Sequence, residues 1–460
     1  MVIDPRHSVL PGLMASATVA FLMMLNGQSE AAIVTAATTI LCVTWWIFEP
    51  VPIPVTSLLP LALMPAFGVL TPAETGAAYG SPLILLLLGG FLLSRGMEST
   101  GAHRRLALGV VDLMGSDSPR KLVFGFMVAG ASLSMWISNT ATVLMLVPVA
   151  LAVIDSTTEK ERLAIPLLLG LAWACSIGGL GTPIGTPPNL IFMQVYQEFT
   201  GESVSFTRWM GWGVPVVLVL VPLAALWLTR DLPKTLSVVM PETGPWRSAE
   251  VRVLMIFALT ALAWMTRSEP FGGWRQWLGL PNANDASVAF VAVVMMFVVR
   301  DRDGDPLITW KQAANIPWGV LLLFAGGICL AKAFVVSGLS AAAGDMLIGL
   351  ANLPIFWMLL LLCLAVTFMT EATSNTATTA LLMPILAAAG AAAGVEPALL
   401  MVPAAMSASC AFMLPVATAP NAVIFGTDRV PIQKMVSEGF ALNIAGALVI
   451  SMLMYLLLPR

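Results

Sequence analysis

Two identical polar pentapeptides lie inside apolar stretches of the sequence, and their residue types suit ligand binding. Ser-Asn-Thr-Ala-Thr occupies residues 138–142 and recurs at 374–378, which is 236 residues later. Polar groups at membrane depth are costly unless they serve a function. Hydroxyl and amide groups both donate and accept hydrogen bonds, so each Ser-Asn-Thr triplet could bind an ion or a small polar molecule.

The composition predicts a membrane protein. The chain has 460 residues, of which 58% are hydrophobic and only 10% are charged, whereas soluble domains average about 25% charged residues. Long apolar runs recur, for example Leu83–Leu93, Val214–Leu228 and Ile444–Leu458. We therefore predict an all-α polytopic protein of the cell (cytoplasmic) membrane, with about 11 transmembrane helices plus two re-entrant hairpins.

Few residues suit covalent or metal chemistry. The five cysteines lie singly in apolar runs without metal-ligand spacing, and the two histidines, His7 and His103, lie in polar stretches. No nucleophile–base pair is evident, so we do not expect an enzyme. We expect membrane lipid, and no nucleic acid, around the protein.

Further features recur on both sides of the triplets, at separations that drift only from 237 to 232 residues. Collinear matches of this kind indicate a duplicated unit. The matching residues are Gly89-Gly90 with Gly326-Gly327, Ser134 with Thr370, Pro148 with Pro384, and Thr186, Pro188 and Asn189 with Thr418, Pro420 and Asn421.

Each unit contains two interrupted elements. We predict hairpins at 119–138 and 353–374 that bring a triplet to the tip, and broken helices at 167–193 and 399–425, where glycine and proline prevent a continuous helix. Irregular backbone at membrane depth is tolerated only beside protein or a watery cavity. The interrupted elements of both units should therefore converge on one site.

These elements divide the chain into four predicted parts. Residues 1–93 form the scaffold of the first repeat, and 94–230 form its interfacial helix and the domain that contains its interrupted elements. Residues 231–335 form a hinge loop and the second scaffold, and 336–460 form the second interfacial helix and the second domain of interrupted elements.

The site must work largely with neutral groups, because the one charged residue close to a triplet is Glu371. Two helix N-termini, one from each unit, would suit an anion with two acidic groups. Neutral donors compensate an anion poorly in a low-dielectric site, so co-bound cations are expected. Ser134 with Asn139, and Thr370 with Asn375, could supply oxygens for Na⁺.

Simpler interpretations exist for these residues. Ser, Asn and Thr often only join membrane helices, at about 0.6 kcal/mol per hydrogen bond, although two matched copies favour a site. Glu371 could bind a proton or cation. Its equivalent is Met135, which favours a structural or solvent-facing role. Arg95 and Lys332 could attract anions, but we favour contact with lipid headgroups. For Glu49 we favour a cap or an interfacial anchor.

The sequence resembles the divalent anion/sodium symporter family over nearly its whole length. The resemblance rests on both triplets, on Trp-Trp-x-x-Glu-x-x-Pro-x-Pro-Val-Thr-x-Leu-Leu-Pro at 45–60, and on Gly-Thr-Pro-Ile-Gly-Thr-Pro-Pro-Asn at 181–189. Members of this family are secondary transporters of di- and tricarboxylates, most of them sodium-coupled and some of them exchangers.

The resemblance implies roles for individual residues. The substrate carboxylates would contact the two triplets and a nearby threonine, namely Ser138, Asn139, Thr140, Ser374, Asn375, Thr376 and Thr418. One sodium site would comprise Ser134, Ser138, Asn139 and Gly185, and the other Thr370, Asn375 and Ala417. The resemblance also implies inverted repeats, a homodimer held by the scaffold domains, and elevator motion.

The leading hypothesis is symport of a C4-dicarboxylate, such as succinate, malate or fumarate, with two or more Na⁺. A sodium-independent dicarboxylate exchanger of the same fold and an anion channel are the alternatives. One departure from the first copy is Ala419, which stands where that copy has Pro187. It leaves the backbone near Thr418, and hence the preferred acid, open.

Overall fold

The computed structural model describes residues 9–115, 118–157, 159–233, 244–268, 272–339, 354–392 and 394–459. Within these ranges the regular structure is helical, apart from one isolated bridge between Arg300 and Pro306. Eight helices of the described residues can cross a membrane by length and composition, and shorter apolar helices accompany them. The prediction of an all-α polytopic protein is confirmed. Some of the predicted transmembrane segments form long helices, and others form shorter apolar helices.

The duplication predicted from the sequence is visible in the order of the helices. Six helices of the first half have a counterpart in the second. The pairs are α6 (Pro82–Thr100) with α17 (Trp318–Val336), α8 (Pro119–Ser134) with α19 (Ile355–Ala372), α9 (Asn139–Ser156) with α20 (Asn375–Ala392), α10 (Lys160–Gly178) with α21 (Ala398–Ala408), α11 (Pro187–Thr200) with α22 (Ala419–Phe425), and α12 (Phe206–Leu228) with α23 (Ile432–Leu457).

Two predicted connections are only partly described. The residues predicted to form the first interfacial helix include α7 (Ala102–Met114), an amphipathic helix packed against α8. Its expected counterpart falls mainly on residues 340–353, outside the described residues. The hinge loop after Arg230 likewise includes residues 234–243, which lie outside them.

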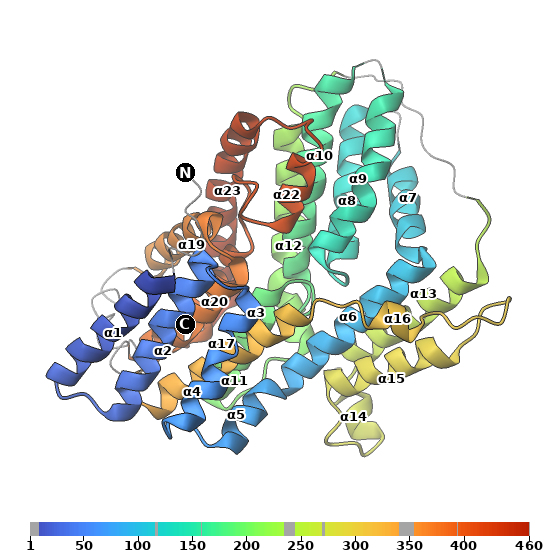
Figure 1. Cartoon of the computed structure of the whole chain (residues 1–460). Helices are drawn as coiled ribbons and strands as arrows, with labels where there is room; N and C mark the ends of the chain where they lie inside the picture. The colour runs from blue at the N-terminus through green and yellow to red at the C-terminus, as the bar shows by residue number, and fades with distance from the viewer. Residues whose placement is uncertain are drawn as a thin grey trace.

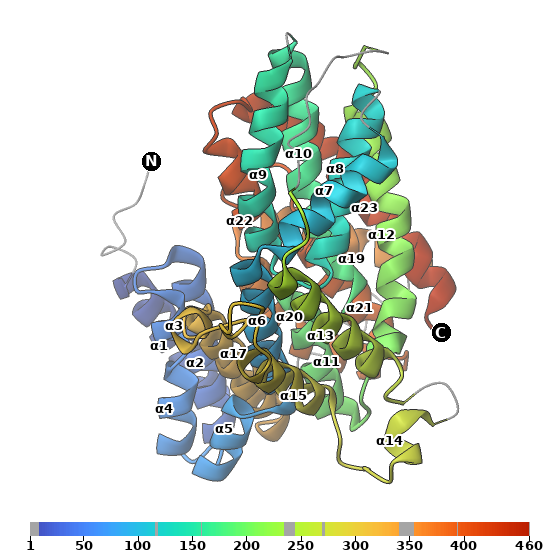
Figure 2. The ribbon, with the colours of Figure 1, turned by 90° about the vertical axis from the view of Figure 1, so that its right-hand side faces the viewer.

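The remaining helices surround α6 and α17. The N-terminal helices pack around α17, and those of the central region lie beside α6. Figures 1 and 2 show them beside and below an upright bundle that includes α8, α9, α10, α12 and α23. These surrounding helices are α1 (Val9–Leu25), α2 (Glu30–Phe48), α3 (Ile53–Thr56), α4 (Leu59–Ala66), α5 (Pro72–Tyr79), α13 (Ser248–Met265), α14 (Gly273–Trp277), α15 (Asp285–Val298) and α16 (Trp310–Ala313).

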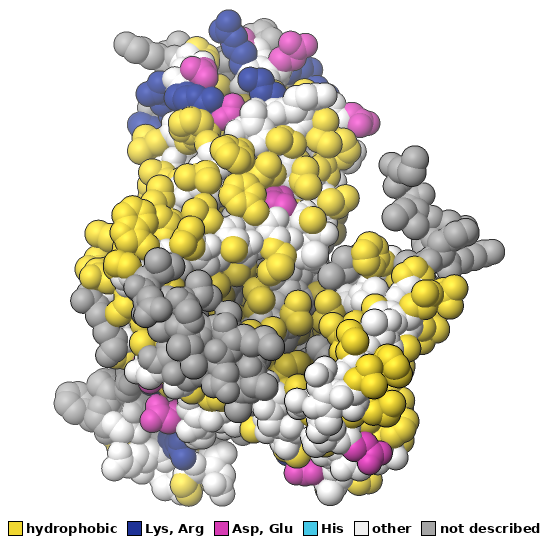
Figure 3. Space-filling model, turned by 90° about the vertical axis from the view of Figure 1, so that its left-hand side faces the viewer, with side chains coloured by type: hydrophobic (Ala, Val, Ile, Leu, Met, Phe, Trp, Pro, Cys, Tyr) yellow, Lys and Arg dark blue, Asp and Glu magenta, His cyan; other side chains and the backbone are white. Residues whose placement is uncertain are grey.

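The surface has the polarity of a membrane protein. Figure 3 shows Lys and Arg side chains gathered at one end, next to a face that hydrophobic side chains cover. Asp155 at the end of α9 pairs with Lys160 and Arg429, both at 3.3 Å, and so connects the two repeats. These partners are exposed, so the pairs add little stability.

Each triplet lies where a turn leads into a helix, with its serine in the turn and its asparagine and threonine at the start of the helix. α8 ends at Ser134 and α9 begins at Asn139, while α19 ends at Ala372 and α20 begins at Asn375. The 16 residues of α8 span about 24 Å at 1.5 Å per residue, less than the roughly 30 Å of a bilayer core. α8 is therefore short enough to turn back inside the membrane, whereas α9 and α19 have the length and composition of membrane spans.

A buried ion pair near the start of α15 should stabilise the fold. Arg267 Nε donates to Asp285 Oδ1 at 2.6 Å, and both side chains are nearly buried. Replacing Arg267 by Ala leaves an unpaired carboxylate, which costs about 3 kcal/mol. We expect a clearly lower midpoint of thermal unfolding in detergent.

The matched control is Arg162→Ala. Arg162 pairs with Glu159 at 3.1 Å, but both side chains are exposed. Its midpoint should stay within experimental error of the parent protein. Equal midpoints for the two variants would contradict a stabilising role of the Arg267–Asp285 pair.

Candidate functional site

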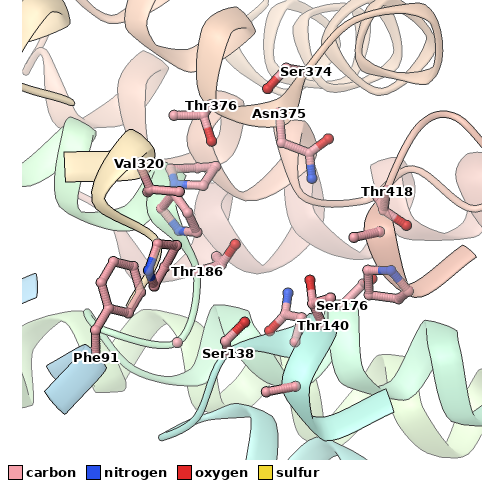
Figure 4. Close-up of a pocket in the computed structure, with 18 of the residues that line it drawn as sticks. Phe91, Ser138, Thr140, Ser176, Thr186, Val320, Ser374, Asn375, Thr376 and Thr418 are labelled. Carbon is pink, nitrogen blue, oxygen red and sulfur yellow. The ribbon is translucent and has the colours of Figure 1, made fainter. Parts of the chain in front are cut away.

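Both triplets line one cavity of about 870 Å³. Figure 4 shows Ser374, Asn375 and Thr376 on one side of it, with Ser138 and Thr140 opposite. Thr186, Ser176 and Thr418 complete the polar wall. All seven residues that the resemblance assigned to substrate thus border a single space.

Four helices of the hairpins and broken helices begin at this cavity. Ser138 is the N-cap of α9, Thr186 that of α11 and Thr418 that of α22, while α20 begins at Asn375. Each helix start carries partial positive charge and unpaired N–H groups. α11 opens with two prolines, which lack N–H groups. The backbone donors at this wall therefore come chiefly from α9 and α20.

Each half of the site is completed by the other repeat. α11 of the first repeat packs against α20 and α21, and α22 of the second packs against α9 and α10. Thr186 Oγ1 lies 3.5 Å from Ser409 Oγ, so a side-chain contact also joins the halves. Neither repeat forms the cavity alone.

Two asparagines hold the broken helices in shape. Asn189 Nδ2 donates to the carbonyls of Gly179 and Thr182, at 2.9 and 2.8 Å. Asn421 Nδ2 donates to those of Ala411 and Leu414, both at 3.1 Å. The sequence marked Asn189 and Asn421 as repeat mates. It did not predict that they bind the loop carbonyls. The matched Thr-x-Pro-Asn sequences at the two positions could have indicated such a shared role.

Oxygen atoms gather behind the first triplet. Ser134 is fully buried behind the cavity wall, and its hydroxyl meets the Asn139 side-chain amide. The carbonyls of Cys175 and Gly185 lie 3.2 Å from the same end of that amide. With its oxygen at this end, Asn139 faces only acceptors. Two arrangements would remove the repulsion between these oxygens. Either the Asn139 amide is rotated so that its nitrogen donates to them, or a cation binds among them.

A similar cluster lies behind the second triplet. Thr370 is fully buried, and its hydroxyl lies 2.7 Å from Asn375 Oδ1 and 2.9 Å from the carbonyl oxygen of Ala408. Of the predicted sodium residues, Ser134 and Thr370 lie behind the wall. The others border the cavity, namely Ser138, Asn139, Gly185, Asn375 and Ala417.

Two glycines allow the first cluster to form. A Cβ on Gly185 would lie 2.5 Å from the carbonyl oxygen of Gly179, and a Cβ on Gly179 would lie 2.8 Å from Asn139 Oδ1. Neither approach is possible with a side chain present. The sequence indicated the glycine-rich break, but not that Gly179 contacts the triplet asparagine.

Charged residues at the cavity depart in part from expectation. Arg95, for which we favoured headgroup contact, lines the cavity and pairs with Glu98. Lys332 lies 3.8 Å from Glu74. Glu49 forms the C-cap of α2, as favoured, and also borders the cavity. Among the described residues of this wall, Arg95 is the one cationic side chain.

Glu371 is buried rather than solvent-facing, so that half of its prediction was wrong. The structural half is right, since its carboxylate accepts hydrogen bonds from backbone N–H groups.

A cavity bordered by broken helices from two repeats, inside a polytopic helical protein, is the architecture of a secondary transporter. The comparisons with known proteins agree. The family model described as citrate transporter matches residues 43–402. The chain belongs to this transporter family, the divalent anion/sodium symporters, and is a multi-pass membrane protein.

The relatives extend over nearly the full chain. The sodium-dependent dicarboxylate transporter SdcS of Staphylococcus saprophyticus is 38% identical over 94% of this chain and 88% of its own. SdcS of Staphylococcus aureus strain MW2 is also 38% identical, over 92% of this chain and 85% of its own. The YdaH transporter of Alcanivorax borkumensis shares the fold, with a TM-score of 0.59 over 82% of this chain and 85% of its own, at 15% identity.

Gly185 provides a direct test of the first cluster. We expect Gly185→Ala to reduce transport by at least about tenfold, because the added methyl group forces the loop away from Asn139. Initial uptake rates in proteoliposomes, normalised to protein content, measure this.

Gly109→Ala in α7 is the matched control, since a Cβ there meets no atom within 4 Å. Its uptake should equal that of the parent protein. Parental uptake by Gly185→Ala would show that the loop does not need this close approach.

Proposed function

We propose that the protein is a secondary transporter that couples uptake of a C4-dicarboxylate, such as succinate, malate or fumarate, to sodium. One observation carries the proposal: two helix N-termini with hydroxyl and amide groups border one cavity, and an oxygen cluster lies behind each. The names of the relatives, sodium-dependent dicarboxylate transporters, support it.

The arrangement suits an anion with charge at both ends. One carboxylate would accept hydrogen bonds from Ser138, Asn139 and Thr140, and the other from Ser374, Asn375 and Thr376. The free N–H groups at the starts of α9 and α20 add backbone donors. Recognition by two separate tips favours dicarboxylates over monocarboxylates, which would leave one tip without a partner.

Sodium would supply the positive charge that the triplets lack. An ion among the oxygens of Ser134, Asn139 and Gly185 would lie directly behind the first tip. A second ion at Thr370, Asn375 and Ala417 would lie behind the other. Anion and cations attract each other strongly in a site that excludes water, so substrate binding would require sodium.

The two asparagines connect the bound ions. Asn375 Oδ1 faces Thr370, which leaves its NH₂ group for a ligand in the cavity. An asparagine can therefore accept a cation at its oxygen and donate to a carboxylate from its nitrogen. This shared contact is a physical basis for coupling.

We further propose that transport is by elevator motion. The cavity wall combines the tips with residues of α6 and α17, such as Phe91 and Val320. The site would move with the hairpins and broken helices past α6 and α17, which would remain fixed in the membrane.

Proteoliposomes with an inward sodium gradient should accumulate labelled succinate against its own gradient. Replacing sodium by choline should abolish accumulation. Uptake that requires internal dicarboxylate instead of sodium would establish the exchanger alternative, and flux without saturation or counterflow would establish a channel.

The site assignment is tested separately with Asn139→Ala and Asn375→Ala. Each should lower sodium-driven uptake by at least about 100-fold, because each removes a contact to both the anion and a cation. Asn26→Ala, at an exposed position that bonds only locally, is the control. Normal uptake by both triplet variants would refute the assignment.

A further inference from the structure

Glu371 is a buried acidic residue beside the second triplet that does not border the cavity. It lies on the last turn of α19 and is only 4% exposed. Its Oε1 accepts hydrogen bonds from the backbone N–H groups of Phe412, at 2.7 Å, and Met413, at 2.9 Å. Its Oε2 accepts one from Leu414 at 3.0 Å. Three successive backbone donors thus converge on one carboxylate.

A fourth donor comes from another helix. Asn443 of α23 is fully buried, and its Nδ2 donates to Glu371 Oε1 at 2.7 Å. Asn443 Oδ1 in turn accepts from the N–H of Phe412 at 3.2 Å. All four neighbours of the carboxyl group are donors, which suits a carboxylate because it only accepts hydrogen bonds.

The two repeats differ at this point. In the first, α10 continues into a short 3₁₀ helix, Gly179–Gly181. In the second, α21 ends at Ala408 and the following residues through Leu414 are not helical. The N–H groups of Ser409 and Cys410 still donate to carbonyls of α21. Those of residues 412–414 have no helical acceptor, and leaving them unpaired inside the protein would be costly. The carboxylate of Glu371 takes the place of those acceptors.

The first repeat needs no such group. The residue equivalent to Glu371 is Met135, and a Cβ on Gly181 would lie 2.7 Å from Met135 Cε, which shows how closely the thioether covers the 3₁₀ turn. An apolar contact in one repeat thus corresponds to a charged one in the other.

The loop held by Glu371 leads directly into the second half-site. Residues 409–418 end at Ala417 and Thr418, both of which border the cavity. Thr370, the neighbour of Glu371, contacts both Asn375 and the carbonyl of Ala408. The position of this loop therefore determines where the carbonyl groups of the second oxygen cluster lie.

We propose that Glu371 is a positioning residue for cation binding at the second half-site. It fixes the backbone of residues 412–414 and, through it, the loop that presents Ala417 and Thr418. The proposal rests on the proposed sodium coupling. Cation binding in the second repeat would then depend on a buried carboxylate, whereas the first repeat has Met135 at the equivalent position and would not.

The test is Glu371→Gln in proteoliposomes. Its amide nitrogen would face N–H donors, so the loop loses part of its anchor. We expect the sodium concentration for half-maximal succinate uptake to rise about tenfold, with a smaller change in the rate at saturating sodium. An unchanged sodium requirement would overturn the proposal.

Glu250→Gln is the matched control. Glu250 is equally buried, and it accepts hydrogen bonds from Arg105 and from the side chain and backbone N–H of Arg247, away from the cavity. This variant should lose stability without a change in its sodium requirement. A similar shift in both variants would mean that Glu371 acts only through general stability.

A rescue variant separates positioning from folding. Asn443→Asp combined with Glu371→Gln returns a carboxylate to the side chain that already accepts from Phe412. We expect it to recover much of the lost sodium affinity. If Glu371→Gln does not fold, Asn443→Ala, which removes one donor, should raise the sodium requirement about threefold. No shift in Asn443→Ala would then overturn the proposal.

Hydrogen exchange keeps this test independent of the proposed function. The amides of residues 412–414 should exchange faster in Glu371→Gln than in the parent protein, while those of 180–182 should not change. Sodium-independent uptake by the parent protein would refute the proposed coupling alone. Unchanged exchange at 412–414 would refute the role of Glu371 alone.

Discussion

The pairing of backbone polar groups at membrane depth is the constraint on which this structure depends. A continuous helix satisfies its own N–H and C=O groups, whereas a broken one needs other partners. Here four interruptions meet: two hairpin turns and two loops within broken helices. Asn189 and Asn421 bind the carbonyls of those loops, and Glu371 binds N–H groups. At the hairpin tips, the first N–H groups of α9 and α20 have no acceptor within their own helices, and the Ser138 side chain does not cap α9. These helix starts border the cavity, so the binding site lies where the fold leaves backbone donors available.

The duplicated halves meet this constraint in unequal ways. Both use an asparagine to hold the loop before the second helix segment. The first repeat relies on close backbone approach at Gly179 and Gly185, whereas the second opens its loop and adds a buried carboxylate. Because α11 and α22 each pack against the opposite repeat, a change in one loop also moves a wall of the other half-site. In the proposed sodium coupling, the two half-sites therefore need not have equal affinities for the ion.

Much of this arrangement could be predicted from the sequence, since duplication makes functional residues stand out. The pairs Ser134–Asn139 and Thr370–Asn375 were predicted to lie together, and each pair is in hydrogen-bond contact. The carbonyls of Cys175 and Ala408 could not be predicted, because every residue has a carbonyl group. Arg95 and Glu371 were misjudged in part for a different reason. The sequence gives the cost of a charge in a membrane, but not which backbone donors or partner carboxylates lie nearby.

The near absence of cationic side chains from the cavity has a consequence for transport. An arginine within the triplets would supply positive charge whether or not a cation was bound, so binding of a carboxylate would depend less on a co-bound ion. A neutral site obtains its positive charge from a co-bound cation. It therefore binds an anionic substrate only when that cation is also bound. By linkage, each ion then increases the affinity of the other by the same factor. In the proposed coupling, neutral hydroxyl and amide groups suit this site, because they bind an anion and a cation together better than either alone.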